Sequence, residues 1–431
     1  MPVTAPPSLL IVLEVLRPCF TALSFATFSA LVTGALSASG ARTVTGMWQA
    51  AGLAGRSHWS RAHRFFSRAV WDLDQVGLAL ACAAVARFVP ADGAVTVAVD
   101  DTLFHRYGKK VHAAKYQHDG SAKGRDGIGR GNCFVIAGIV VAVPFLARHV
   151  CLPVLFRLHV PKTSISKTEQ ASAMVGLLAQ VLPERTIHVV GDALYRGPAW
   201  RSLPVRVTFT TRLAANAVLY GPEPPRTGKR GHPAWKGERL GTAAELAATA
   251  TWRRTKVTRY GVTETADLAV ITCLWWGSLR RTPVRVVLVR DLDQTTPCTL
   301  ALATTDLVST GEQIVARYAS RWSIEQSIKD GKQLLGAGDA QNRLPAAVER
   351  TTPLGLANLT ILVLWYDHAG QPATDLSSRR SQAPWYRHKR HVSIEDMIIA
   401  FRRARITSIT AAQDTPDLFA PGTATRDAAA A

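Results

Sequence analysis

The chain has 431 residues, of which 47% are hydrophobic and 19% charged, a composition typical of a folded protein with room for two or three domains. Lys and Arg number 51 against 31 Asp and Glu, so the formal net charge is +20. This excess of positive charge attracts polyanions, of which nucleic acid is the commonest. The alternative explanation is a protein from a high-GC genome, in which Arg replaces Lys, and the many Ala and Arg residues fit it.

Six cysteines are spread singly along the chain, without a Cys-x-x-Cys pair: Cys19, Cys82, Cys133, Cys151, Cys273 and Cys298. They predict buried thiols in a reducing compartment and no structural zinc site. The chain lacks the basic start of a signal peptide. The uncharged stretch 19–41 is long enough to span a bilayer, but its Ser and Thr side chains would face lipid. We therefore expect a buried helix there, a cytoplasmic location and no membrane partner.

Residues 1–90 are predicted to be helical throughout. One helix near 9–16 should stop at Pro18, and a second should run to about Gly34.

A short helix over 42–53 is followed, after a glycine turn, by a basic helix over 57–68 with Ser57 as its N-cap. This pattern favours a helix-turn-helix that presents Arg61 and Arg64 to DNA. An ordinary helical hairpin with a basic outer face has the same pattern, and it remains the alternative.

The pattern of residues 91–211 predicts an α/β domain with a mixed sheet. Its expected elements are strands at 94–99, 133–143 and 149–158, a helix at 166–182, and strands at 186–190 and 205–210. Ser166 and Glu169 form a possible capping box at the start of the helix.

Two of these strands are expected to end on a carboxylate, Asp100 and Asp192. Functional groups of open α/β sheets gather at strand ends, although each Asp alone is also a common turn residue. With Glu325 on a later helix, the two acids make three separated carboxylates. Oxygen ligands of this kind suit Mg²⁺, and nucleases use such sets to hold two metal ions.

Residues 212–305 are predicted to be a β-rich insertion subdomain between Asp192 and the helix that carries Glu325. A Pro-rich, Gly-rich and basic loop opens it, and Lys229 and Arg230 in that loop can lie against phosphates. The strands expected after the loop lie at 252–260, 268–275, 284–289 and 299–304.

Residues 306–370 are expected to form the second part of the core. Helical spacing places one carboxylate among several cations along a single stripe, formed by Tyr318, Arg321, Glu325, Lys329 and Lys332. A solvated helix face with Arg–Glu and Glu–Lys pairs explains the stripe in one way. An acid that binds a cation, beside bases that bind a polyanion, explains it in another.

The segment 354–366 is too short to span a membrane and is expected to be buried. Residues 371–431 should contain a basic run, a helix at 394–405 and a disordered tail from about 412. The basic run consists of Arg379, Arg380, Arg387, Lys389 and Arg390.

The stripe resembles the signature of the DDE transposases of bacterial insertion sequences, specifically the insertion-sequence-4 type. That signature reads Tyr, two residues, Arg, three residues, Glu, six residues, Lys, and the chain matches it in spacing with Tyr318, Arg321, Glu325 and Lys332. The Asp-x-Thr context of Asp100, the second acid after the fourth strand and the β-rich insertion are also similar to that family.

The resemblance implies an α/β fold with a ribonuclease-H-like catalytic core, the β-rich insertion and an all-α N-terminal DNA-binding region. It also implies that Asp100, Asp192 and Glu325 bind two Mg²⁺ or Mn²⁺ ions for DNA strand cleavage at transposon ends and strand transfer. Tyr318, Arg321 and Lys332 would hold the phosphates, assisted by Lys329. Of the neighbours Asp100 and Asp101 the family pattern favours Asp100, and only one should reach the site because adjacent strand residues face opposite sides.

The implied partners are double-stranded DNA, both terminal inverted repeats and target DNA, and a second copy of the chain in a homodimeric synaptic complex. A catalytically silent DNA-binding protein derived from such an enzyme is the main alternative, and the intact acids argue against it. A hydrolase that acts on other substrates is a third hypothesis, which the net charge of +20 and the basic loops disfavour.

Overall fold

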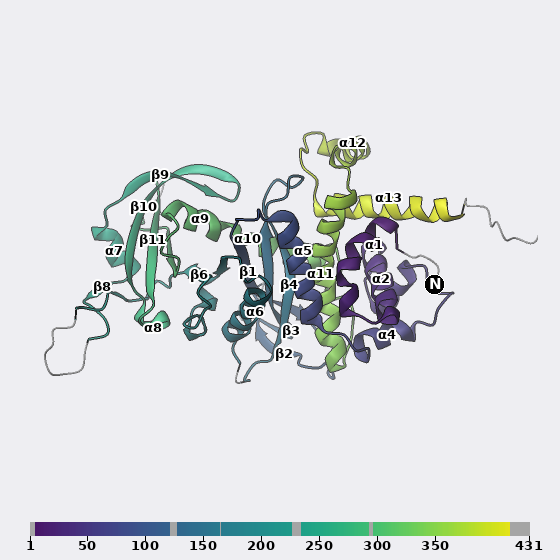
Figure 1. Cartoon of the computed structure of the whole chain (residues 1–431), viewed down its shortest axis with the longest axis horizontal. Helices are drawn as coiled ribbons and strands as arrows, with labels where there is room; N and C mark the ends of the chain where they lie inside the picture. Colours follow the sequence, from purple (N-terminus) through teal and green to yellow (C-terminus); the bar gives the residue numbers. More distant parts are fainter. Residues whose placement is uncertain (1–4, 121–126, 164, 226–233, 293–295, 414–431) are drawn as a thin grey trace, which may run out of the picture.

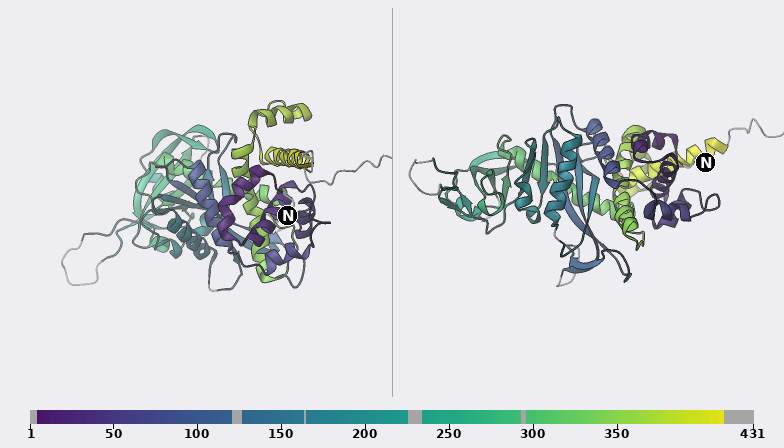
Figure 2. Two further views of the ribbon diagram at one scale, coloured as in Figure 1. Left: turned by 45° about the vertical axis from the view of Figure 1, so that its right-hand side comes forward. Right: turned by 60° about the horizontal axis from the view of Figure 1, so that its bottom comes forward.

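The computed structural model describes residues 5–120, 127–163, 165–225, 234–292 and 296–413. Helices, a central sheet and a second β-rich region follow one another along the longest axis (Figure 1), and the same succession is visible in the two further views (Figure 2). The basic loop with Lys229 and Arg230 and the tail after residue 413 lie outside the described residues.

The core sheet is built around β1 (Val95–His105). It pairs antiparallel with β3 (Ile128–Val141) and parallel with β5 (Ile187–Gly191). Beyond these, β4 (Val150–His159) pairs antiparallel with β3, and β6 (Val207–Arg212) pairs parallel with β5. The order β4-β3-β1-β5-β6 confirms the predicted mixed sheet, and its continuous apolar runs reflect burial on both faces.

The predicted end of the first strand at Asp100 is wrong. β1 continues through this residue to His105, because β3 pairs with it without interruption from Thr96↔Val140 to His105↔Gly131. The parallel neighbour β5 does end as predicted, at Gly191, directly before Asp192.

The strands of residues 212–305 extend this same sheet. They join it where β12 (Leu300–Thr304) pairs antiparallel with β6, and they continue through β11 (Pro283–Asp291) and β10 (Val262–Leu274). A hairpin joins β10 to β9 (Arg253–Arg259), with positive φ at Tyr260 and Gly261 in its turn. The smaller elements are β2 (Lys115–His118), β7 (Leu219–Tyr220), β8 (Arg239–Gly241), α7 (Ala243–Thr249) and α8 (Trp276–Leu279).

Helices cover both faces of the sheet. On one face lies α6 (Lys167–Val181), whose Ser166–Glu169 capping box is present as predicted. On the other lie α10 (Trp322–Gln333), which follows α9 (Gly311–Ser320), and α11 (Pro345–Ala369). Side-chain hydroxyls of Ser327 on α10 and Thr360 on α11 donate to carbonyls of β4.

The described residues before the sheet form helices: α1 (Pro7–Leu13), the 3₁₀ helix η1 (Glu14–Cys19), α2 (Ala22–Ser37), α3 (Val44–Ala50), α4 (Ser60–Ser67) and α5 (Leu73–Phe88). Two details differ from the prediction. The first helix ends at Leu13, and Pro18 lies within the following 3₁₀ turn. Ser57 does not cap the basic helix, which begins at Ser60; the Ser57 carbonyl instead accepts a hydrogen bond from the Trp48 indole.

The uncharged stretch 19–41 forms α2, which is buried as expected. Two of its hydroxyls are satisfied within the helix, since Thr27 and Thr33 donate to carbonyls one turn earlier. In the ranges that the structure describes, no helix has the length and apolar character needed to cross a membrane.

The chain ends with α12 (Pro372–Gln382), the 3₁₀ turn η4 (Pro384–Tyr386) and α13 (Ile394–Gln413). The segment 354–366 is buried as predicted, within the longer helix α11.

The contact between α5 and β4 gives a first prediction. A Cβ at Gly77 on α5 would lie 2.0 Å from the Val154 carbonyl oxygen of β4, so Gly77→Ala must push the helix off the sheet. We expect a loss of about 1–3 kcal/mol in the free energy of unfolding, measured with urea. The matched control is Gly176→Ala on α6, where nothing lies within 4 Å and helix propensity should add about 0.5–1 kcal/mol. Equal effects of the two substitutions would contradict the packing.

Candidate active site

Strand register places Asp100 and Asp192 side by side. The last paired residues of the parallel strands β1 and β5 are Val99 and Gly191, and each is followed by one of the acids. Beyond Gly191 the chain turns into the 3₁₀ helix η2 (Ala193–Tyr195), which the Asp192 carboxylate caps by accepting from the Leu194 N–H at 2.8 Å. Both acids therefore sit at the level where β5 ends, as the strand-end argument predicts.

Arg321 brings the third acid to this place. The predicted single helix of the stripe is broken into α9 and α10, and Arg321 lies at the break. Its guanidinium Nη1 lies 3.4 Å from Asp100 Oδ2, and its Nη2 lies 2.6 Å from Glu325 Oε1. One cation thus holds an acid of β1 and an acid of α10. The Arg321 side chain is only 15% exposed, so a solvated helix face does not explain it.

Asp100 is a carboxylate that its surroundings destabilise. Burial raises its pKa to about 7, and the negative charges of Asp192 and Asp101 add to the effect. The positive charge of Arg321 and the Asp101 N–H act in the opposite direction without outweighing burial. A buried carboxylate with a raised pKa is stabilised in its charged form by an added cation.

The neighbouring Asp101 faces the other side of β1, where its charge is fully compensated. Lys167 Nζ of α6 lies 2.5 Å from one carboxylate oxygen, and the Cys133 thiol donates to the same oxygen at 3.2 Å. The Tyr195 hydroxyl donates to the other oxygen at 3.2 Å. Since Tyr195 belongs to η2, this bond ties the turn that holds Asp192 to the strand that holds Asp100. Asp100 and Asp101 therefore point to opposite sides of β1, as expected of adjacent strand residues.

Lys332 reaches β1 from the far end of α10. Its ammonium donates to Thr102 Oγ1 at 2.7 Å and to the Leu103 carbonyl at 2.8 Å, and it lies 4.8 Å from the centre of the Phe104 ring. Burial lowers the pKa of Lys332. Thr102 is two residues beyond Asp100 and shares its face of the strand, which explains the Asp-x-Thr spacing physically.

Two more residues of the stripe differ in their surroundings. Tyr318 is half-buried in the last turn of α9, with the Arg321 guanidinium 5.9 Å from its ring centre. The pKa of Tyr318 is raised, first by burial and also by the negative charge of Asp192. Tyr318 therefore lies near Asp192 as well as Arg321. Lys329 is exposed on α10, one turn beyond Glu325.

The candidate residues of the N-terminal helices lie apart from these acids. Arg64 is exposed on α4. Arg61 is held against α2, because its Nε donates to Thr27 Oγ1 at 2.8 Å and its Nη2 donates to the Leu23 carbonyl at 3.1 Å. Sequence reasoning missed Tyr195 and Lys167, for which only the finished fold provides a signal.

The donor set suits a hard divalent cation, since all three acids offer oxygen. Within the described residues, no three or more His, Cys, Asp or Glu side chains are already arranged around a metal position. The guanidinium of Arg321 lies between Asp100 and Glu325, in contact with a carboxylate oxygen of each. The chemistry of these three donors fits a divalent ion, and Arg321 occupies the space between two of them.

Comparison with known proteins identifies the family of the chain. Residues 15–275 match the family described as DDE superfamily endonuclease. The matched range includes Asp100 and Asp192 and stops before Glu325. No curated protein matches the chain.

The two faces of β1 give a second prediction. In the folded state Asp100 titrates near pH 7, above its ordinary value of 3.8, so its ionisation costs nothing below pH 4 and the full amount above pH 7. Asp100→Asn should therefore stabilise the metal-free protein at pH 8 by roughly 2–4 kcal/mol and lose this advantage near pH 4.

Asp101→Asn is the matched comparison for that experiment. It leaves the Lys167 ammonium without its partner, and it should cost about 1–3 kcal/mol at pH 8 in the same urea titration. If both asparagine variants lose stability equally at pH 8, Asp100 is not a destabilised carboxylate.

Proposed function

The chain belongs to the DDE superfamily of endonucleases, and from this premise we propose that it is a transposase. It would cut DNA strands at transposon ends and join the freed 3′ ends to target DNA. Asp100, Asp192 and Glu325 would be its catalytic acids and metal ligands. The observation that carries the proposal is the bridge that Arg321 makes between Asp100, 221 residues earlier in the chain, and Glu325.

The sheet supports a ribonuclease-H-like core around these acids. Three strands in antiparallel succession, β4, β3 and β1, are followed on the other side of β1 by two parallel strands, β5 and β6. The helix with Glu325 packs across this sheet from the face that Asp100 occupies. An arrangement of this kind brings three acids from distant parts of the chain to one place.

Members of the DDE endonuclease superfamily generally use divalent metal ions, and Asp100, Asp192 and Glu325 would hold two Mg²⁺ or Mn²⁺ ions here. When bound, such ions make a water or a DNA 3′-OH more acidic and stabilise the charge of the leaving oxygen.

The cations around the acids would hold the DNA backbone. Arg321 already binds two oxyanions, and its planar fork of donors fits a phosphate equally well. Lys332 uses two of its three N–H donors on β1, which leaves the third for a phosphate oxygen. Tyr318 and Lys329 would contact the same strand on either side of Glu325.

Further contacts are proposed outside the acid site. Arg64, on the exposed side of α4, would approach DNA, while the bonds of Arg61 to α2 make it a support of that helix. Lys229 and Arg230 remain proposed phosphate contacts of the insertion loop. Joining two ends implies a homodimer during synapsis, and the six free cysteines support a location in the reducing cytoplasm.

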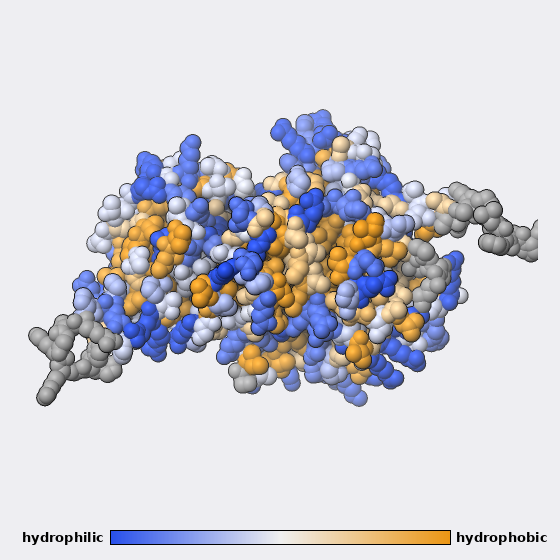
Figure 3. Space-filling model, in the orientation of Figure 1, coloured by the Kyte–Doolittle hydropathy of each residue, from blue (hydrophilic) through white to orange (hydrophobic). Residues whose placement is uncertain are grey.

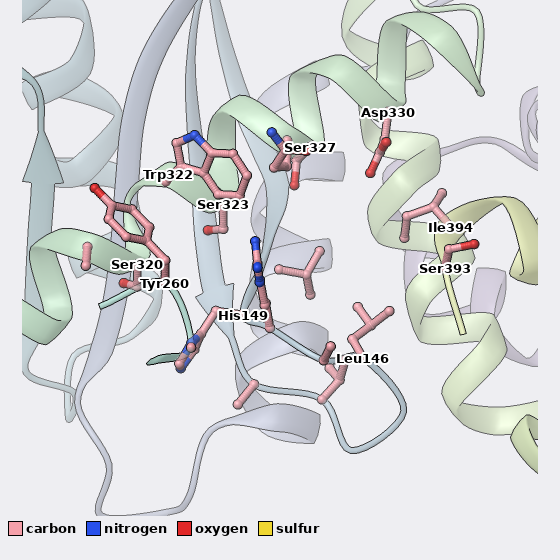
Figure 4. Close-up of a pocket in the computed structure, with 18 of the residues that line it drawn as sticks. Leu146, His149, Tyr260, Ser320, Trp322, Ser323, Ser327, Asp330, Ser393 and Ile394 are labelled. Carbon is pink, nitrogen blue, oxygen red and sulfur yellow. The ribbon is translucent and has the colours of Figure 1, made fainter. Parts of the chain in front are cut away.

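A third prediction tests the catalytic acids. Purified protein with Mg²⁺ should nick a duplex that carries the end of its own element. Glu325→Gln and Asp192→Asn should each lower the single-turnover rate at least about 10³-fold, as expected for members of one catalytic unit. Asp330→Asn is the control, because Asp330 is on the same helix and points into a separate cavity (Figure 4). Cleavage retained by Glu325→Gln would remove Glu325 from the catalytic acids. No cleavage by the wild-type protein would leave a catalytically silent DNA-binding protein as the better description.

A fourth prediction concerns Arg321 without DNA. Its guanidinium and a divalent ion compete for the same carboxylates, so Arg321→Gln should bind Mn²⁺ more tightly in a calorimetric titration and yet lose cleavage. Lys329→Gln removes the same charge from the exposed side of α10 and should change Mn²⁺ affinity little. Weaker Mn²⁺ binding by Arg321→Gln would show that Arg321 supports the metal site instead of competing with it.

A further inference from the structure

The C-terminal basic run forms a surface that the proposed catalytic site does not use. We call residues 379–391 the basic turn; it contains Arg379, Arg380, Arg387, Lys389 and Arg390, and the sequence has no Asp or Glu from Leu376 to Ile394. It comprises the end of α12, η4 and the approach to α13. In Figure 1 this part stands out from the body above α11, and its surface is hydrophilic in Figure 3.

A buried acid of α13 fixes the shape of the basic turn. The Asp396 carboxylate, 2% exposed, binds the Lys389 ammonium and accepts from the Ser393 N–H at 2.7 Å and from its hydroxyl at 2.8 Å. Arg379 lies 3.5 Å from the same carboxylate and 2.9 Å from Glu395. Two of the five cations are therefore neutralised from within, and they hold the turn on α13.

The other three cations face outward without a carboxylate. Arg380 donates to the Lys389 carbonyl at 3.0 Å and Arg387 to a ring nitrogen of His388 at 3.0 Å, both neutral partners, and Arg390 is exposed. In the described part of the chain none of the three forms an ion pair. Their charge is thus displayed on a segment that Asp396 holds in place through Lys389 and Arg379, so less loop entropy is lost when an anion binds.

An aromatic side chain accompanies these charges. Trp385 is 77% exposed, whereas the neighbouring Tyr386 ring is covered by the Arg379 guanidinium, 4.9 Å from its centre. An exposed Trp beside uncompensated arginines is typical of a contact surface. Arg forks match phosphate oxygens, and the face of the indole can lie on a sugar.

The position of the turn connects it to the catalytic helix. Ser393 and Ile394, at its base, line a cavity of about 470 Å³ together with Trp322, Gln326 and Asp330 of α10 (Figure 4). The helix that carries Glu325 and the residues that directly follow the basic turn therefore line one cavity.

We propose that the basic turn is a second DNA-contact surface, which binds the phosphate backbone of the duplex beside the position that is cut. This inference rests on the proposed function for the identity of the DNA. The contact would be independent of sequence, because the turn offers phosphate-binding donors on a convex surface.

The test replaces Arg380, Arg387 and Arg390 by Ala in the full chain and measures binding of end and unrelated duplexes by fluorescence anisotropy over a range of salt concentrations. Three lost phosphate contacts should reduce the slope of log K against log salt by about 2–3, equally for both duplexes. Trp385→Ala should weaken binding about tenfold with the slope unchanged.

The matched control removes the same net charge elsewhere. Arg17, Arg206 and Arg239 are each about half exposed and paired with a glutamate, so their triple Ala variant should keep the wild-type slope. Thermal unfolding of both triple variants checks that they are folded. Should the first be unstable, Arg387→Gln with Arg390→Gln should still reduce the slope by about 1–2.

The outcomes separate this inference from the proposed function. If the wild-type protein binds DNA through the basic turn and never nicks it, the proposed transposase function fails and the proposed DNA-contact surface stands. Nicking by wild type, with an unchanged salt slope in the first triple variant, would overturn the surface alone. Loss of self-association in that variant, measured by light scattering with DNA binding intact, would assign the turn to a second copy and also overturn it.

Discussion

The interaction on which this structure depends is the guanidinium of Arg321 between the carboxylates of Asp100 and Glu325. Asp100 lies inside a sheet strand, where burial favours its protonated form, and the fold supplies one nearby cation to oppose this. That cation arrives from a break between two helices, more than 200 residues later in the chain. The extended sheet, the helix break and the packing of α10 on β4 all serve to deliver it. If these acids are the proposed metal ligands, a divalent ion would compete with Arg321 for the same carboxylate oxygens.

The two faces of β1 give two neighbouring acids different surroundings, one with many partners and one, the proposed metal ligand, with few. Asp101 has a full complement of partners, with Lys167, Tyr195 and Cys133 around its two oxygens. Asp100, one residue earlier, shares a single guanidinium with Glu325 and stands near the charge of Asp192. The structural face supports the other, because Tyr195 follows Asp192 in the chain and its bond to Asp101 sets the position of the turn. The well-compensated charge of Asp101 therefore helps to hold in place the less compensated charges of Asp100 and Asp192.

Sequence reasoning reached the parts of this arrangement that depend on local spacing. The stripe of residues 318–332 lies along α9 and α10, the Ser166 cap is present, and Asp192 follows its strand as predicted. It failed where the rest of the fold decides. β1 runs past Asp100 because β3 pairs with it, and Ser57 is not a cap because the helix begins three residues later, at Ser60. The break at Arg321 has no Pro or Gly to announce it, and the tie between Tyr195 and Asp101 has no local pattern at all.

The same distinction governs the positive charge of the chain. A count of +20 describes attraction at long range, and it does not say which cations touch a polyanion. Arg61 bonds with α2, and Arg379 and Lys389 pair with the acids at the start of α13, so these residues stabilise the fold. The outward cations are those whose charge no carboxylate compensates, such as Arg387 and Arg390. The basic run therefore contains two kinds of cation. Arg379 and Lys389 pair with acids of α13 and hold the segment in place, whereas the exposed arginines lie on its surface.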